Sequence, residues 1–116
     1  MTDKQFSTVW LEALEDNGSR EAFVSDWATS SLFLDPMDAD AKIDMSLIEK
    51  LGNIWDVAHL SMKAIQVDSG FNVSGFAAHY AIPQRTLEGW LSGRPCPPYV
   101  KLLLVESLHL IERQQF

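Results

Sequence analysis

The sequence predicts an all-α protein organised as a small helical bundle. Apolar residues recur three and four positions apart through most of the chain, which is the spacing of one face of a helix. Residues that cap helices stand before several of these stretches, and glycine or proline follows them. The 116 residues are 47% hydrophobic and include four tryptophans, a composition typical of one packed globular domain.

The first part of the chain is expected to hold four helices. Residues 3–16 carry a regular apolar stripe, and a second helix follows whose buried face continues to Leu32. Residues 43–58 form the longest apolar stripe and predict a buried central helix, followed by a short helix over residues 62–68. The expected N-terminal residues of the second, third and fourth helices are Ser19, Asp44 and Ser61.

The following stretch predicts two short helices joined by a tight turn. Asn72 stands where it can cap a helix over residues 73–80. Pro83 suits the start of a second helix, because its missing N–H costs nothing there. That helix, residues 84–92, has one apolar and one polar face, and Gly93 is its expected C-terminal cap. Two helices joined in this way form a helix-turn-helix unit, whose second helix can enter the major groove of DNA.

A spaced set of residues connects this unit with a known family. The set follows the pattern F-A-x-x-x-x-I-P-x-R-T-L-x-x-W-x-x-G-x-x-x-P-P-x-Y-V and comprises Phe76-Ala77, Ile82-Pro83, Arg85-Thr86-Leu87, Trp90, Gly93 and Pro97-Pro98-Tyr99-Val100. With it, about residues 59–110 resemble the Cro/C1 (XRE-like) helix-turn-helix family, and most of all a bacterial subgroup. The resemblance implies a dimeric, sequence-specific DNA-binding transcriptional regulator of a bacterium, phage or mobile element. Val73 replaces a glutamine that contacts phosphate in the family, and Ala81 replaces the usual turn glycine.

The polar face of the second helix carries the expected base contacts. Gln84 can pair with adenine, Arg85 with guanine or phosphate, and Glu88 can accept from cytosine. Arg94, in the loop after the helix, is a candidate phosphate clamp. The full set of predicted DNA-contacting residues is Asn72, Ser74, Gln84, Arg85, Thr86, Glu88 and Arg94. The alternative is that Gln84 and Glu88 are solvated, while Arg85 forms a local ion pair with Glu88.

The last predicted helix, residues 99–113, follows a proline-rich segment and is apolar on nearly all sides. Such a helix must be covered on more than one side. Either the N-terminal helices pack over it, or a second copy of the chain does. We expect a homodimer to contribute, with Tyr99, Leu102 and Val105 at its interface.

The chain is expected to comprise an acidic N-terminal helical region, 1–58, and a helix-turn-helix region, 59–116, packed as one compact unit. Of the net charge of −7, residues 1–69 carry −8 and residues 70–116 carry +1. With so few cations, a single copy is expected to bind double-stranded DNA weakly, and dimerisation to double the contacts. The acidity also favours a competing function, a protein-interaction module or mobile-element inhibitor of the anti-CRISPR kind. Such a protein would bind a basic protein partner through its acidic surface.

The sequence offers no convincing catalytic constellation, so we expect no enzyme and no cofactor. His59, His79 and His109 are scattered, and no two of them have the spacing of metal ligands on a helix. Cys96 is near a cation, Arg94, but no base stands beside it in the sequence.

Four aspartates between residues 35 and 44 raise the question of a calcium-binding loop. A calcium-binding loop needs a central glycine and a closing glutamate at fixed positions, and both are missing here. We therefore expect no metal. No apolar run is long enough to span a membrane, the N-terminus lacks the pattern of a signal peptide, and the single cysteine permits no internal disulfide. A cytoplasmic location is the simple interpretation.

Overall fold

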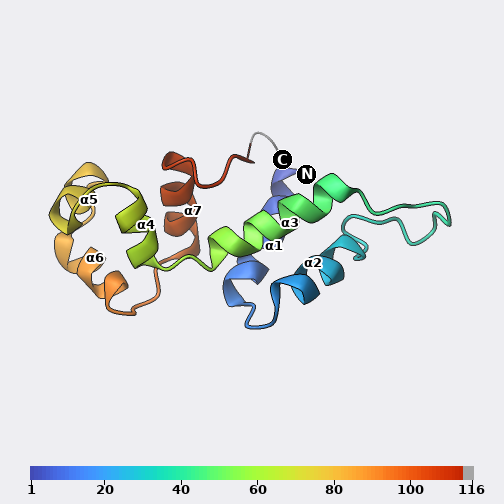
Figure 1. Ribbon diagram of the computed structural model, residues 1–116, viewed down its shortest axis with the longest axis horizontal. Helices are drawn as coiled ribbons and strands as arrows, with labels where there is room; N and C mark the ends of the chain where they lie inside the picture. Colours follow the sequence, from blue (N-terminus) through green and yellow to red (C-terminus); the bar gives the residue numbers. More distant parts are fainter. Residues whose placement is uncertain (114–116) are drawn as a thin grey trace. The chain divides into compact units, whose positions relative to one another are not determined.

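The computed structural model describes residues 1–113, which form seven α-helices and no β-strand (Figure 1). The all-α prediction is confirmed. The helices are α1 (Asp3–Glu15), α2 (Arg20–Ala28), α3 (Met45–Ala58), α4 (Met62–Asp68), α5 (Val73–His79), α6 (Gln84–Leu91) and α7 (Pro98–Ser107). No helix among these residues is long and apolar enough to cross a membrane.

The chain divides into two compact units. Unit 1 comprises Met1–His59 together with residues 111–113, and unit 2 comprises Leu60–Leu110. Unit 2 is therefore shorter than the predicted region 59–116, of which residues 114–116 lie outside the described residues.

Unit 1 is built around α3, against which both α1 and α2 pack. Side-chain caps start all three helices, as Thr2, Ser19 and Asp44 each accept a hydrogen bond from a backbone N–H of the first turn. Arg113 donates to Asp3 at 3.0 Å, so the segment after α7 returns to α1. The buried apolar residues of unit 1 are Phe6, Val9, Trp10, Ala13, Phe23, Val24, Ala28, Leu51, Ile54, Val57, Ala58 and Ile111.

The second helix ends at Ala28, so the prediction that it continues to Leu32 is wrong. The Thr29 hydroxyl donates to the carbonyl oxygen of Ser25 at 2.8 Å, and the Ser30 hydroxyl donates to that of Trp27 at 2.7 Å. Side chains of this kind offer the last turn of a helix partners that compete with further backbone bonds.

The acidic stretch that follows is an exposed, non-helical loop. The Asp35 carboxylate accepts from the backbone N–H of Met37 at 2.9 Å, and that of Asp38 accepts from the N–H of Asp40 at 3.0 Å. Such bonds stabilise local turns. Turn formation therefore accounts for the spacing of these aspartates.

Unit 2 contains α4 to α7 around a smaller core. Ser61 caps α4 and Asn72 caps α5, as predicted. The buried Gln66 side chain donates to the carbonyl oxygen of Phe71 at 2.6 Å and fixes the connection between these helices. The buried apolar residues of unit 2 are Met62, Ile65, Phe76, Ala77, Leu87, Leu104 and Val105.

Three helices of unit 2 end in the same backbone geometry. A residue with positive φ follows each helix: Ala81 (54°) after α5, Gly93 (114°) after α6 and His109 (58°) after α7. The next backbone N–H in each case bonds back to the helix, which is the Schellman motif. These bonds are Ile82 to Ala77 at 2.8 Å, Arg94 to Gly89 at 2.9 Å and Leu110 to Val105 at 2.9 Å. The last helix therefore stops at Ser107, and its predicted extension to residue 113 is wrong.

Candidate nucleic-acid interface

Helices α5 and α6 form a pair joined by the short connection from Tyr80 to Pro83. Leu87 on α6 is fully buried, and α6 packs against both α5 and α4. The opposite face of α6 is exposed and presents four polar side chains to solvent, Gln84, Arg85, Thr86 and Glu88. The amphipathic pattern of the sequence thus leaves hydrogen-bonding groups on the first turns of α6.

The polar groups on α6 are arranged differently from the predicted alternative. Glu88 accepts a hydrogen bond from the Gln84 amide at 3.1 Å, one helical turn away. Glu88 forms no ion pair with Arg85, and the Arg85 guanidinium has no ion pair with any residue in 1–113. The strongest donor of this face is therefore available to a ligand.

Arg94 lies back across α6 at a position that lacks a side chain. A Cβ atom at Gly89 would be 3.1 Å from Cδ of Arg94 and 3.4 Å from its Nη1. The helical glycine thus makes room for the arginine, whose side chain is exposed. Sequence reasoning did not connect Gly89 with Arg94, although a glycine inside a helix, which costs about 1 kcal/mol relative to alanine, was a usable signal.

The two predicted contacts on α5 have different structural roles. The Asn72 side chain accepts from the backbone N–H of Gly75 at 2.7 Å, so it acts as the helix cap. Its amide group retains donors for a second partner. A Cβ at Gly75 would be 3.0 Å from the side-chain Oδ1 of Asn72, so the glycine leaves space for this cap. Ser74 is exposed at the start of α5.

The predicted dimer residues on α7 do not share one surface. Tyr99 is 69% exposed and Leu102 is half-buried, but Val105 is fully buried. Val105 belongs to the core, so its assignment to an interface is wrong. Leu103, one helical turn after Tyr99, is 62% exposed and was not among the predicted residues. The nearly all-round apolar pattern of α7 could not separate these positions.

The chemistry of Cys96 is that of a shielded thiol. Burial raises the pKa of Cys96, and the charge of Lys101 opposes this only in part. Burial also lowers the pKa of Lys101. An activated nucleophile needs the opposite shift. Among residues 1–113, no three histidine, cysteine or acidic side chains gather as a metal-binding group.

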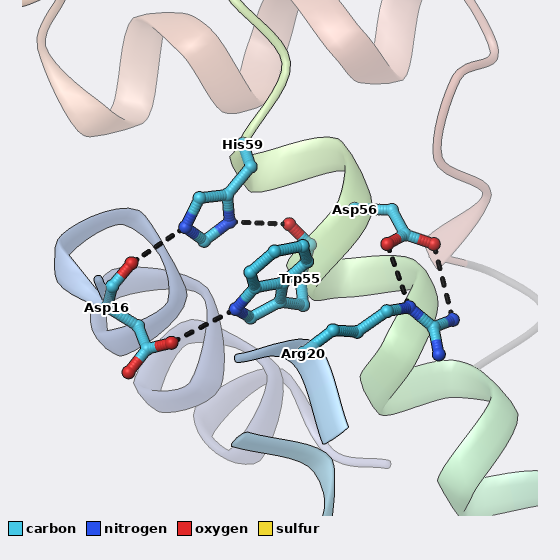
Figure 2. A network of polar contacts seen from close by, with 5 residues as sticks. All are labelled: Asp16, Arg20, Trp55, Asp56 and His59. Carbon is cyan, nitrogen blue, oxygen red and sulfur yellow. Dashed lines mark hydrogen bonds and ion pairs between the residues drawn. The ribbon is translucent and has the colours of Figure 1, made fainter. Parts of the chain in front are cut away.

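Unit 1 holds a polar network that sequence reasoning missed (Figure 2). The Arg20 guanidinium donates to both carboxylate oxygens of Asp56, at 2.8 and 3.2 Å. It also covers Gly52 of α3, where any Cβ would overlap it. The indole N–H of Trp55 donates to the Asp16 carboxylate at 3.1 Å, and the ring stacks on His59.

No family model, curated protein or solved structure matches the chain.

Proposed function

We propose that the chain is a sequence-specific DNA-binding regulator that acts as a dimer. In this proposal α5 and α6 form a helix-turn-helix, and α6 enters the major groove. The observation that carries the proposal is the start of α6, where Gln84, Arg85 and Thr86 are exposed and Arg85 has no ion pair among the described residues. The N-terminal residues of a second helix make the base contacts in this motif.

Each side chain has a specific role in the proposed complex. Arg85 donates two parallel hydrogen bonds to guanine, and Gln84 pairs with adenine. Glu88 already accepts from the Gln84 amide, so it orients that amide and does not read cytosine. Arg94, held against α6 at Gly89, reaches a phosphate.

The charge of unit 2 supports a dimer. Residues 60–110 hold four cations and three anions, for a net charge of +1. DNA affinity grows with the number of phosphates that cations neutralise, so one copy offers little. The exposed Tyr99 and Leu103 give α7 apolar surface for a second copy, and pairing doubles the phosphate contacts.

Binding to the duplex enriched from a random library tests the roles on α6. Arg85→Ala is expected to lose about 1–3 kcal/mol of binding and to relax preference at one base position. Lys42→Ala, which removes one positive charge from unit 1, is the control and is expected to keep that preference. Equal affinity of wild type and Arg85→Ala would remove Arg85 from the interface.

A second candidate function is favoured by the charge of unit 1. Residues 1–59 hold twelve acidic and four basic residues, a net charge of −8. Asp35, Asp38 and Asp40 are exposed in one loop. A surface of this charge attracts a basic protein at low ionic strength.

Asparagine substitutions at these three aspartates separate the two candidates. Asparagine keeps the turn-forming hydrogen bonds and removes the charge. If unit 1 recognises a basic protein through this loop, the triple variant loses capture by a lysine-rich protein while its DNA binding is retained. Unchanged capture would exclude recognition through the acidic loop.

A further inference from the structure

The ring of His59 lies between two backbone carbonyl groups of unit 1 (Figure 2). Its Nδ1 is 2.8 Å from the carbonyl oxygen of Trp55, and its Nε2 is 2.7 Å from the carbonyl oxygen of Asp16. A carbonyl oxygen only accepts hydrogen bonds. A neutral imidazole has one N–H, so it can donate to one of these oxygens and must turn a lone pair toward the other. Only the imidazolium donates to both.

The surroundings of the ring favour a positive charge. The Trp55 indole stacks on the imidazole with ring centroids 4.0 Å apart, and the face of an indole attracts a cation. His59 and Asp16 are also the C-terminal caps of α3 and α1. The C-terminus of a helix carries partial negative charge, and two such ends meet at this ring.

Charged groups reach this site from all three helices of unit 1. The end of α1 contributes the Asp16 carboxylate, which is bound to the Trp55 indole N–H. The start of α2 contributes Arg20, and α3 contributes Asp56. These last two form an ion pair at 2.8 Å, so their charges offset each other. The Asp16 carboxylate belongs to the same residue whose backbone carbonyl faces Nε2 of His59.

We propose that His59 is a protonation-dependent clamp at the end of unit 1. The imidazolium ties the C-terminus of α1 to that of α3 through its two N–H groups. His59 is also the last residue of unit 1 before the chain enters unit 2 at Leu60. Protonation thereby fixes the residue from which the chain leaves unit 1, and loss of the proton releases one of its two attachments.

The direction of the pH dependence follows from the donors. The protonated ring makes both bonds in the folded chain and neither in the unfolded chain, so protonation stabilises the fold at acidic pH. This contribution is lost as pH rises and the ring gives up its proton. The clamp is therefore closed in acid, and one of its two attachments is lost in base.

Nitrogen NMR of the histidine rings tests the clamp in the unaltered protein. At about pH 5, below the pH at which a histidine in a peptide loses its proton, we expect Nδ1 of His59 to show a coupling to the Trp55 carbonyl group and Nε2 a coupling to that of Asp16. In base, one of these two couplings is expected to disappear. A protonated ring that lacks either coupling would overturn the proposal.

Unfolding of matched variants gives a second, independent test. Between about pH 5.5 and pH 8, the unfolding equilibrium constant of unit 1 is expected to rise about tenfold in wild type, the scale of one charge-assisted hydrogen bond. His59→Gln is expected to abolish this rise, and His79→Gln in unit 2 to retain it. Parallel pH profiles for wild type and His59→Gln would contradict the clamp. If His59→Gln does not fold, the ring-nitrogen measurement decides.

Discussion

Each unit holds an arginine across a helical glycine, but the two arginines differ in their partners. In unit 1, Arg20 covers Gly52 and is bound through two hydrogen bonds to Asp56. In unit 2, Arg94 lies against Gly89 and has no ion pair within residues 1–113. The same local device thus fixes helix packing in unit 1 and leaves a cation available to a ligand in unit 2.

The two faces of α6 give the largest expected contrast. Leu87→Ala removes a fully buried side chain and is expected to destabilise unit 2 by about 3 kcal/mol. Arg85→Ala, on the exposed face of the same helix, is expected to change stability by less than about 0.5 kcal/mol. Denaturant unfolding followed by circular dichroism measures both. If Arg85→Ala costs as much as Leu87→Ala, Arg85 serves the fold and not a ligand.

The effect of Gly52→Ala on the stability of unit 1 is expected to change sign when the Arg20 side chain is removed. Gly52→Ala places a Cβ on the Arg20 guanidinium and should destabilise unit 1 by about 1–2 kcal/mol. In an Arg20→Ala background the obstacle is gone, and the same change should stabilise by about 1 kcal/mol through helix propensity. The free energies of unfolding of wild type, the two single variants and the double variant give the coupling energy between Gly52 and Arg20. A Gly52→Ala effect of the same sign in both backgrounds would show that Arg20 does not depend on the glycine.

Substitution of the unit 2 glycine, Gly89, by alanine should raise stability, whereas Gly52→Ala lowers it. Arg94 is exposed and can move away from a new methyl group, so Gly89→Ala is expected to stabilise by about 0.5–1 kcal/mol. Because the arginine is displaced, affinity for DNA should fall severalfold while the fold is strengthened. Thermal unfolding and DNA titration of one preparation measure both effects. Unchanged affinity would show that Arg94 does not contribute to DNA binding.

The smallest expected effect concerns Cys96 of unit 2, and it changes only the reactivity of the thiol. Since burial raises the pKa of Cys96, its thiolate fraction at a given pH is below that of a free cysteine. Labelling by an aromatic disulfide should be slower than for glutathione, with a midpoint at higher pH. Because the Lys101 charge lowers the pKa of Cys96, Lys101→Met should move that midpoint further up. A downward movement would contradict this assignment.

The sequence predicts the starts of these helices better than their ends. Ser19, Asp44, Ser61 and Asn72 all cap helices as expected, because an N-cap depends on one side chain and its own next turn. The end of α7 depends on His109 in a conformation usual for glycine, which residue type did not reveal.

Contacts between residues far apart in the sequence also could not be predicted from the sequence. The polar face of α6 follows from spacing alone and was predicted. The bond between Trp55 and Asp16 joins residues far apart in the chain, and the ring of His59 acts through backbone carbonyl groups. Backbone carbonyls are present at every position, so no pattern of residue types marks them.

The most direct measurement is the selection of random duplex DNA on the purified protein at about 0.1 M salt, where screening already weakens nonspecific attraction. We expect enrichment of a palindrome whose half-sites lie about one helical turn of DNA apart and contain guanine and adenine at the positions facing Arg85 and Gln84. A folded protein that enriches no sequence would contradict DNA reading by α6.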